Sequence, residues 1–357
     1  MKSTLIMAVS AAAAILTGCN KSDSQTAIYE VHEAELRLSV SEDTGSTKAV
    51  DVGEYTVAET YEKQVNSVQV FVFEGENIVA YKNLGTQTSS TISTKVGPKT
   101  VWAVVNGPDL KSVKTLTELT GKAIRLEDNK KDASKGFIMS GSSSVELAAG
   151  GSTCNIKVSR LVSRITLKEI KNSLPAGYGA ITIERAFLAN VVGNQSIGGT
   201  ASPNLWYNKE GRADESPRNS SHIIDGAAYK ASAEELTFVN AGSASISNGG
   251  TLAALSTKPY MFYTFPNSST AEVNGYTASG GGQRSVLVIV ARIDGQVSYY
   301  PVILKTGALE RNKTYNVGVE LTGPGSSDPN IPVIKGNINV YISVEEWIAG
   351  ATYNEVI

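Results

Sequence analysis

The residue types that carry most protein chemistry are scarce in this chain. Its 357 residues include only two Cys and two His, which excludes a zinc site built from several such ligands. His32 lies near the N-terminus and His222 in a loop-rich stretch, and the sequence has no G-x-S-x-G turn, Walker-type loop or H-E-x-x-H pair. We therefore expect no enzymatic activity, no metal and no cofactor.

One cysteine lies in a context that predicts covalent lipid attachment. Residues 1–18 read as a signal peptide, because Lys2 precedes an apolar run over residues 5–16 that is too short to span a bilayer. The run ends in Leu16-Thr17-Gly18-Cys19, which resembles the lipobox of bacterial lipoproteins. We expect lipid on Cys19 to be the only membrane attachment. The alternative is an ordinary signal peptide followed by an incidental cysteine.

The second cysteine, Cys154, has no disulfide partner once Cys19 carries lipid. It lies in an alternating strand pattern over residues 153–158. This context favours a buried core thiol over a nucleophile.

Composition and charge narrow the class of protein. Hydrophobic residues make up 41% of the chain, enough to build a core, and charged residues only 18%. The net charge is −2, so electrostatics give no reason to expect a nucleic-acid partner.

Alternation of apolar and polar residues is the dominant pattern, and it predicts a mainly β protein. One helix is expected over residues 109–120, with Gly121 as its cap. A single long strand region is expected over residues 156–170. The break at Leu174-Pro175-Ala176-Gly177 places a division between two domains after residue 174. Further strands are predicted over residues 34–40, 68–73, 78–82, 88–96, 100–105, 180–192, 260–265, 285–293, 296–305, 313–321 and 336–344.

Several stretches together resemble the fimbrillin family, the lipoprotein pilins of protease-dependent type V fimbriae. They are Trp102-Ala103-Val104-Val105-Asn106, Phe137-Ile138-Met139-Ser140-Gly141, the paired-Arg segment 158–165, residues 309–317 and 323–326, and the terminal strand 340–347 that ends in Trp347. The resemblance implies two tandem transthyretin-like Greek-key β-sandwich domains with one or few short helices. They would span residues 49–174 and 175–357, after a lipidated propeptide of residues 19–48.

The propeptide contains a strand and an exposed loop. Leu36, Leu38 and Val40 share one face of the strand. The polar loop over residues 41–48 is open to proteases, and a trypsin-like cut between Lys48 and Ala49 would release the strand with its lipid. The resemblance implies Arg at the cut, so Lys48 is a departure. Arg37 is the alternative cut, although it lies inside the strand.

Residues 350–357 form a short alternating tail in which Ala351, Tyr353 and Ile357 share one face with Glu355. Loss of the propeptide strand would open a groove that such a tail, from a neighbouring copy, can fill. Contacts of this kind do not close on themselves and generate filaments.

These observations predict a structural pilin subunit for a surface fimbria used in adhesion. Its expected partners are other copies of itself, accessory fimbrial subunits, a trypsin-like surface protease and, before cleavage, the outer membrane. Two alternatives stay open. One is an accessory, tip or anchor subunit. The other is a monomeric surface lipoprotein that binds glycan or host protein, for instance through aromatic residues such as Trp206 and Tyr207.

Overall fold

The computed structural model describes residues 32–43, 59–200, 202–207, 234–268, 284–304, 308–329, 331, 333–334 and 336–347. Several residues singled out in the sequence lie outside these ranges, namely Cys19, Lys48, Ala49, His222, Ala351, Tyr353, Glu355 and Ile357.

Strands dominate the described residues, and the few helices are short, which confirms the expected fold class. The first group of elements is β1 (Glu33–Glu42), α1 (Thr60–Lys63), β2 (Val68–Glu74), β3 (Asn77–Gly85), β4 (Ser89–Lys95), β5 (Gly97–Val105), α2 (Leu116–Gly121), β6 (Ala123–Arg125), η1 (Leu126–Asp128), β7 (Met139–Leu147) and β8 (Ser152–Arg160). The second group is β9 (Ser163–Asn172), β10 (Ile181–Ala189), β11 (Val191–Val192), β12 (Asn194–Ser196), β13 (Trp206–Tyr207), α3 (Glu234–Thr237), β14 (Phe238–Ile246), α4 (Ala254–Thr257), β15 (Tyr260–Thr264), β16 (Val286–Ile293), β17 (Gln296–Ile303), β18 (Lys313–Leu321) and β19 (Ile338–Glu346).

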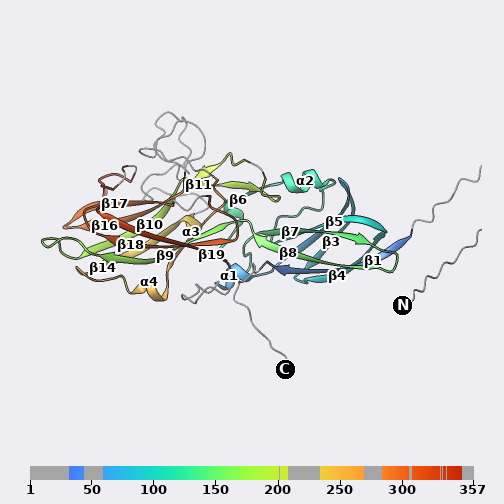
Figure 1. Ribbon diagram of the computed structural model, residues 1–357, viewed down its shortest axis with the longest axis horizontal. Helices are drawn as coiled ribbons and strands as arrows, with labels where there is room; N and C mark the ends of the chain where they lie inside the picture. The colour runs from blue at the N-terminus through green and yellow to red at the C-terminus, as the bar shows by residue number, and fades with distance from the viewer. Residues whose placement is uncertain are drawn as a thin grey trace, which may run out of the picture.

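The first group forms a β-sandwich at one end of an elongated molecule (Figure 1). Its strands pair in the order β3-β2-β5-β7-β8-β1-β4, and this sheet folds over on itself. Alternate side chains of β1, β4 and β8 face those of β2, β5 and β7 across one apolar core. Cys154 belongs to this core and is buried, as expected, and burial raises the pKa of its thiol.

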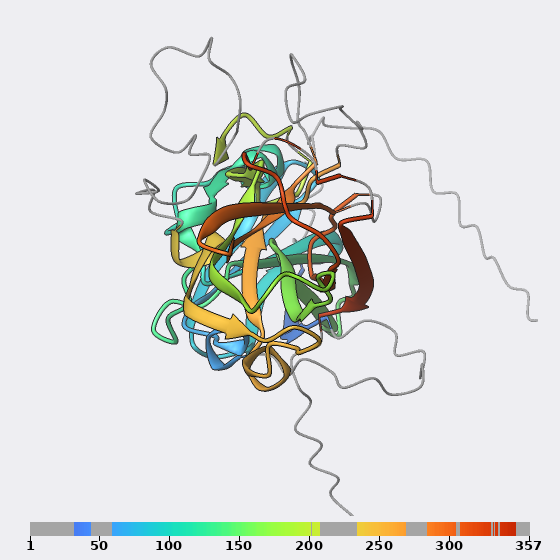
Figure 2. The same cartoon turned by 90° about the vertical axis from the view of Figure 1, so that its left-hand side faces the viewer.

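The second group forms another sandwich, seen end-on in Figure 2. One sheet has the order β14-β10-β16-β17 and the other β15-β9-β18-β19. Their facing side chains build a core that continues to Phe71, Leu110 and Phe137 of the first group. The short β6–β12 pair also links the two groups.

Three expected elements differ from the structure. The strand predicted over residues 180–192 is two strands, β10 and β11, which lie in different sheets. The helix predicted over residues 109–120 begins only at Leu116, because the Thr115 hydroxyl caps it by accepting from Glu118 N. Before that, Leu110 N already donates to the Gln69 side chain at 2.9 Å.

The long strand region predicted over residues 156–170 is two strands, β8 and β9. The chain leaves the first sandwich after Arg160 and pairs in the second from Ser163, with the buried Leu161 and Val162 between them. Sheet membership therefore changes at this point, whereas the sequence analysis placed the division after residue 174.

Candidate functional site

Strand β1 lies inside the first sheet, between β4 and β8. Both neighbours follow β1 in the chain, and β8 is far from it in sequence. Strand β1 pairs antiparallel with β4, from Glu33 opposite Lys95 to Ser39 opposite Ser89. On its other edge it pairs parallel with β8, up to Glu42 opposite Val158. We call the space that β1 occupies between β4 and β8 the β1 groove.

The two faces of β1 differ in the way that the alternation predicts. Leu36 and Leu38 are 0% and 3% exposed and Val40 is 7% exposed, all within the core of the first sandwich. Arg37 points outward and forms a 3.4 Å ion pair with Glu35, both side chains being more than half exposed. Exposed pairs of this kind add little stability. The backbone of Arg37 is paired on both edges, so a protease cannot take it up as an extended substrate.

The last residue of β1 reaches the junction between the two sandwiches. Glu42 forms an ion pair with Arg160, whose side chain is fully buried. Arg160 also donates through Nε to the Glu62 carbonyl at 2.8 Å and through Nη1 to Asn312 Oδ1 at 3.2 Å. Its contacts thus come from β1, from α1 and from the loop before β18. Burial lowers the pKa of Arg160, against the opposing effect of the two glutamates.

A second ion pair lies beside the first. Arg164 Nη1 donates to Glu62 Oε2 at 2.8 Å, and both side chains are buried. The other oxygen of Glu62 accepts from the Tyr263 hydroxyl at 2.6 Å. Burial, reinforced by Glu62, raises the pKa of Tyr263 well above its usual range, so this hydroxyl keeps its proton and remains a donor.

Trp347 covers both guanidinium groups. Its ring lies 4.6 Å from Arg160 Cζ and 4.9 Å from Arg164 Cζ, and the residue is fully buried. Such cation–π contacts are strongest where water is excluded. We call the following residues the junction cluster: Glu42, Glu62, Arg160, Arg164, Tyr263, Asn312 and Trp347.

Several of the stretches that carry the family resemblance meet at or near this junction. Arg160 and Arg164 come from the paired-Arg segment, Asn312 from the region before β18 and Trp347 from the terminal strand. The ring of Phe137 lies 5.9 Å from that of Trp347. The stretches are far apart in sequence but build one structural feature.

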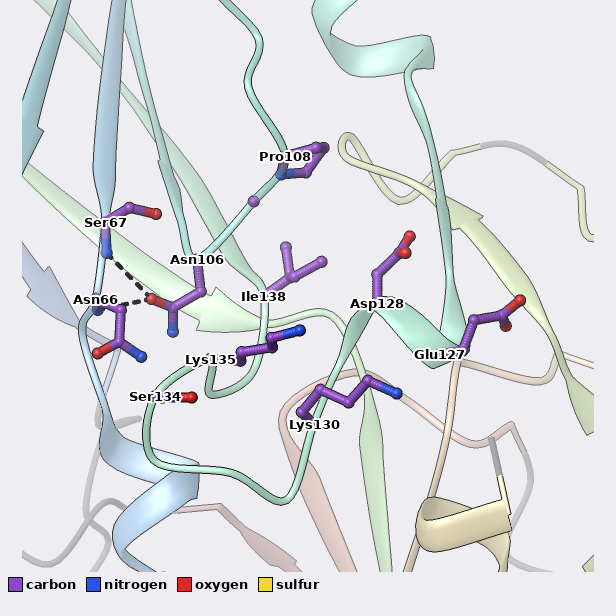
Figure 3. Close-up of a pocket in the computed structure, with 11 residues that line it drawn as sticks. Asn66, Ser67, Asn106, Pro108, Glu127, Asp128, Lys130, Ser134, Lys135 and Ile138 are labelled. Atoms are coloured by element: carbon purple, nitrogen blue, oxygen red, sulfur yellow. Dashed lines mark hydrogen bonds between the residues drawn. The ribbon is translucent and has the colours of Figure 1, made fainter. Parts of the chain in front are cut away.

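Asn106 of another such stretch connects separate loops through its side-chain amide. Its Oδ1 accepts from Asn66 N at 2.8 Å, as Figure 3 shows, and its Nδ2 donates to the Phe137 carbonyl at 3.0 Å. It borders a pocket of about 370 Å³ where Glu127 and Asp128 lie alongside Lys130 and Lys135 (Figure 3). Within the described ranges no cluster of His, Cys, Asp and Glu is fit to hold a metal.

Trp206 and Tyr207 do not form an open aromatic platform. Tyr207 is 2% exposed and donates to the Glu127 carboxylate. Burial raises its pKa to about 12. Trp206 is partly buried against the core of the second sandwich. Tyr207 thus contacts the first group, and both rings pack against the protein itself.

The pairing of Glu42 with Arg160 was not predicted from the sequence. The signal was present, because Glu42 continues the inward alternation of Leu36, Leu38 and Val40. A charged residue on a buried face requires a partner, and the two arginines of the paired-Arg segment were the available candidates.

The fold and the junction define a protein of two β-sandwiches whose first sheet is completed by an N-terminal strand. No helix in the described part is long and apolar enough to cross a bilayer. Residues 34–176 match the family model of the major fimbrial subunit protein (FimA). The match starts inside β1 and ends just after β9.

Solved structures with the same fold come from Bacteroides, Parabacteroides and Porphyromonas species. A candidate cell adhesion protein from Bacteroides eggerthii aligns over 89% of this chain and 97% of its own, with 22% identity and a TM-score of 0.61. One from Parabacteroides distasonis aligns over 88% and 97%, with 17% identity and a TM-score of 0.61. A fimbrilin (FimA) from Porphyromonas gingivalis aligns over 88% and 98%, with 16% identity and a TM-score of 0.59. At these identities the structures show a shared fold.

The resemblance to fimbrillins is therefore confirmed, and it rests on the family match over residues 34–176. The matching family consists of structural subunits of fimbriae and is not an enzyme family.

Proposed function

We propose that this chain is a structural pilin subunit that is exported as a lipoprotein, activated by proteolysis and polymerised by strand exchange into an adhesive surface fimbria. The observation that carries the proposal is β1, an interior strand joined to the rest of the subunit through the segment that contains Lys48. After one cut in that segment, β1 is held in its sheet by noncovalent contacts alone, so that a complete strand can be exchanged.

Removal of β1 leaves a groove suited to another strand. The facing edges of β4 and β8 both lose their backbone partners, and unpaired edges bind extended chains. The core that the inward face of β1 joins is apolar, and its members Val70, Val101 and Ile156 are fully buried.

The tail over residues 350–357 is the proposed occupant, supplied by a neighbouring copy. Its alternation places Ala351, Tyr353 and Ile357 on one face, and each buried large apolar side chain contributes roughly 1.5–3 kcal/mol. Before cleavage, lipid on Cys19 would hold the precursor at the outer membrane. Accessory subunits would use the same groove-and-strand contact.

The test is the substitution Lys48→Ala in the full-length precursor. We expect a lipidated monomer with β1 in place that a trypsin-like protease does not activate, as judged by mass spectrometry of its N-terminus and electron microscopy of fibres. Lys111→Ala, at an exposed loop lysine, is the matched control and should assemble normally. Normal fibres from the Lys48 variant would show that the activating cut lies elsewhere. Fibres from an uncleaved precursor would exclude proteolytic activation.

A further inference from the structure

The junction cluster is electrically balanced only while β1 is present. Two guanidinium groups, Arg160 and Arg164, face two carboxylates, Glu42 and Glu62. Both carboxylates, Glu42 and Glu62, favour the charged form of Arg160. Glu42 belongs to β1 and would leave with it, and in that respect the inference rests on the proposed function.

Glu62 cannot replace Glu42. Its Oε2 accepts from Arg164 at 2.8 Å and from Glu59 N at 2.6 Å, and its Oε1 accepts from Tyr263 at 2.6 Å. Its oxygens are committed to these donors. Only its backbone carbonyl contacts Arg160, at 2.8 Å.

Arg160 also has a side-chain donor that no described residue uses. Its side chain is 0% exposed, and within the described chain its Nη2 atom has no acceptor. A buried guanidinium that loses its carboxylate partner is strongly disfavoured. A strand that enters the β1 groove is therefore favoured if it carries a carboxylate where Glu42 lies.

We propose that Arg160 is the carboxylate receptor of the β1 groove, filled by Glu42 in the precursor and by Glu355 of a second copy's tail in the polymer. Glu355 is the only acidic residue that follows Trp347 in the sequence. Apolar residues of the tail occupy the groove next to Arg160, and the charge pair sets the position at which the tail stops.

The alternation of the tail fixes its register. In β1 the inward residues before Glu42 are Val40 and Leu38. If the tail runs in the same direction with Glu355 at Arg160, then Tyr353 takes the place of Val40 and Ala351 that of Leu38. With the opposite direction Ile357 would take the place of Val40, and Tyr353 and Ala351 would lie outside the groove.

The experiment uses peptides of residues 349–357 to compete with fibre growth by the cleaved full-length chain. The wild-type peptide should stop growth. The Glu355→Gln peptide should need a concentration at least about 30-fold higher, the factor that corresponds to about 2 kcal/mol for a truncated buried charge pair. The Asn354→Gln peptide, changed on the other face, is the matched control and should act like wild type.

A second arm assigns the effect to Arg160. In Arg160→Gln subunits, the wild-type and Glu355→Gln peptides should inhibit growth equally. The peptide comparison on wild-type subunits stands even if this variant does not fold.

Each negative result of these experiments would overturn a different part of the proposal. Equal inhibition of wild-type subunits by the wild-type and Glu355→Gln peptides would overturn the receptor assignment and leave strand exchange intact. Fibres that no peptide inhibits would exclude the tail as the occupant. A cleaved chain that forms no fibres would overturn the proposed function, and this inference with it.

Discussion

At Gly141 the backbone of β7 passes so close to β8 that no side chain fits. A Cβ at this position would lie 1.8 Å from the Lys157 carbonyl oxygen. We expect Gly141→Ala to push the two strands apart and to lower the free energy of unfolding by about 1–3 kcal/mol, the usual cost of overpacking. Thermal unfolding measures the change. Gly150→Ala, where nothing lies within 4 Å, is the control, and equal stability of the two variants would contradict the close approach.

The positive charge of Lys131 lowers the stability of the folded protein, because the side chain is buried. Its Nζ donates to the Met261 carbonyl at 2.9 Å, and burial lowers its pKa from 10.5 to about 8. Below pH 8 the folded protein therefore bears the full cost of burying an ammonium group. Between about pH 8 and 10.5 the folded state releases the proton while the unfolded state still holds it, so stability rises with pH.

The prediction compares wild type with Lys131→Met in urea unfolding at pH 7 and pH 10. The free energy of unfolding of wild type should increase relative to the variant, with a slope of up to about 1.4 kcal/mol per pH unit in this window. Lys111→Met, at an exposed position, serves as control. A difference between wild type and Lys131→Met that does not change with pH would rule out titration of Lys131.

Among the strands, β1 is the one that the proposed mechanism requires in the precursor and removes before the polymer forms. Leu38 is 3% exposed in the core of the first sandwich. Leu38→Ala should destabilise the seated strand by about 2–5 kcal/mol, through lost burial and the cavity left behind. Hydrogen exchange of β1 and of its neighbours β4 and β8 should accelerate in the precursor.

The same substitution should leave assembled fibres as stable as those of wild type, because the proposed mechanism removes β1 before assembly. Arg37→Ala on the exposed face is the control and should change neither state. Fibres weakened by Leu38→Ala would mean that β1 stays in the polymer.

At the scale of the whole molecule, the C-terminal tail is the part proposed to act between subunits. Trp347 is fully buried, and its backbone N–H donates to the Asn312 carbonyl at 3.1 Å. Deletion of residues 350–357 keeps these contacts. We therefore expect a folded monomer by circular dichroism that forms no fibres after cleavage, as seen by electron microscopy. Tyr353→Asp in the intact chain should give the same result, since it places an unpaired charge in an apolar groove.

An unfolded truncation product would show that the tail belongs to its own domain. Normal fibres from it would show that another segment donates the strand. The edge strand β19 is one such segment to examine, because Val340, Tyr341 and Val344 are exposed on it.

Alternation in the sequence predicted most of the longer strands, the inward face of β1 and the buried thiol of Cys154, but it did not predict β7 or β14. These features follow from alternation, which depends on neighbouring residues alone. Sequence could not place the start of α2, because a backbone contact from Leu110 to Gln69, distant in sequence, competes with helix formation. Nor could it find the switch between β8 and β9, since buried residues on both sides hide it.

What the quoted stretches do together becomes visible in the folded protein. Glu42, Glu62, Arg160 and Trp347 are far apart in the chain, and each is unremarkable alone. Folding brings two arginines under one indole ring and gives each a glutamate partner. Charge pairing between distant residues leaves no periodic trace in a sequence, because it depends on distance in space and on the exclusion of water.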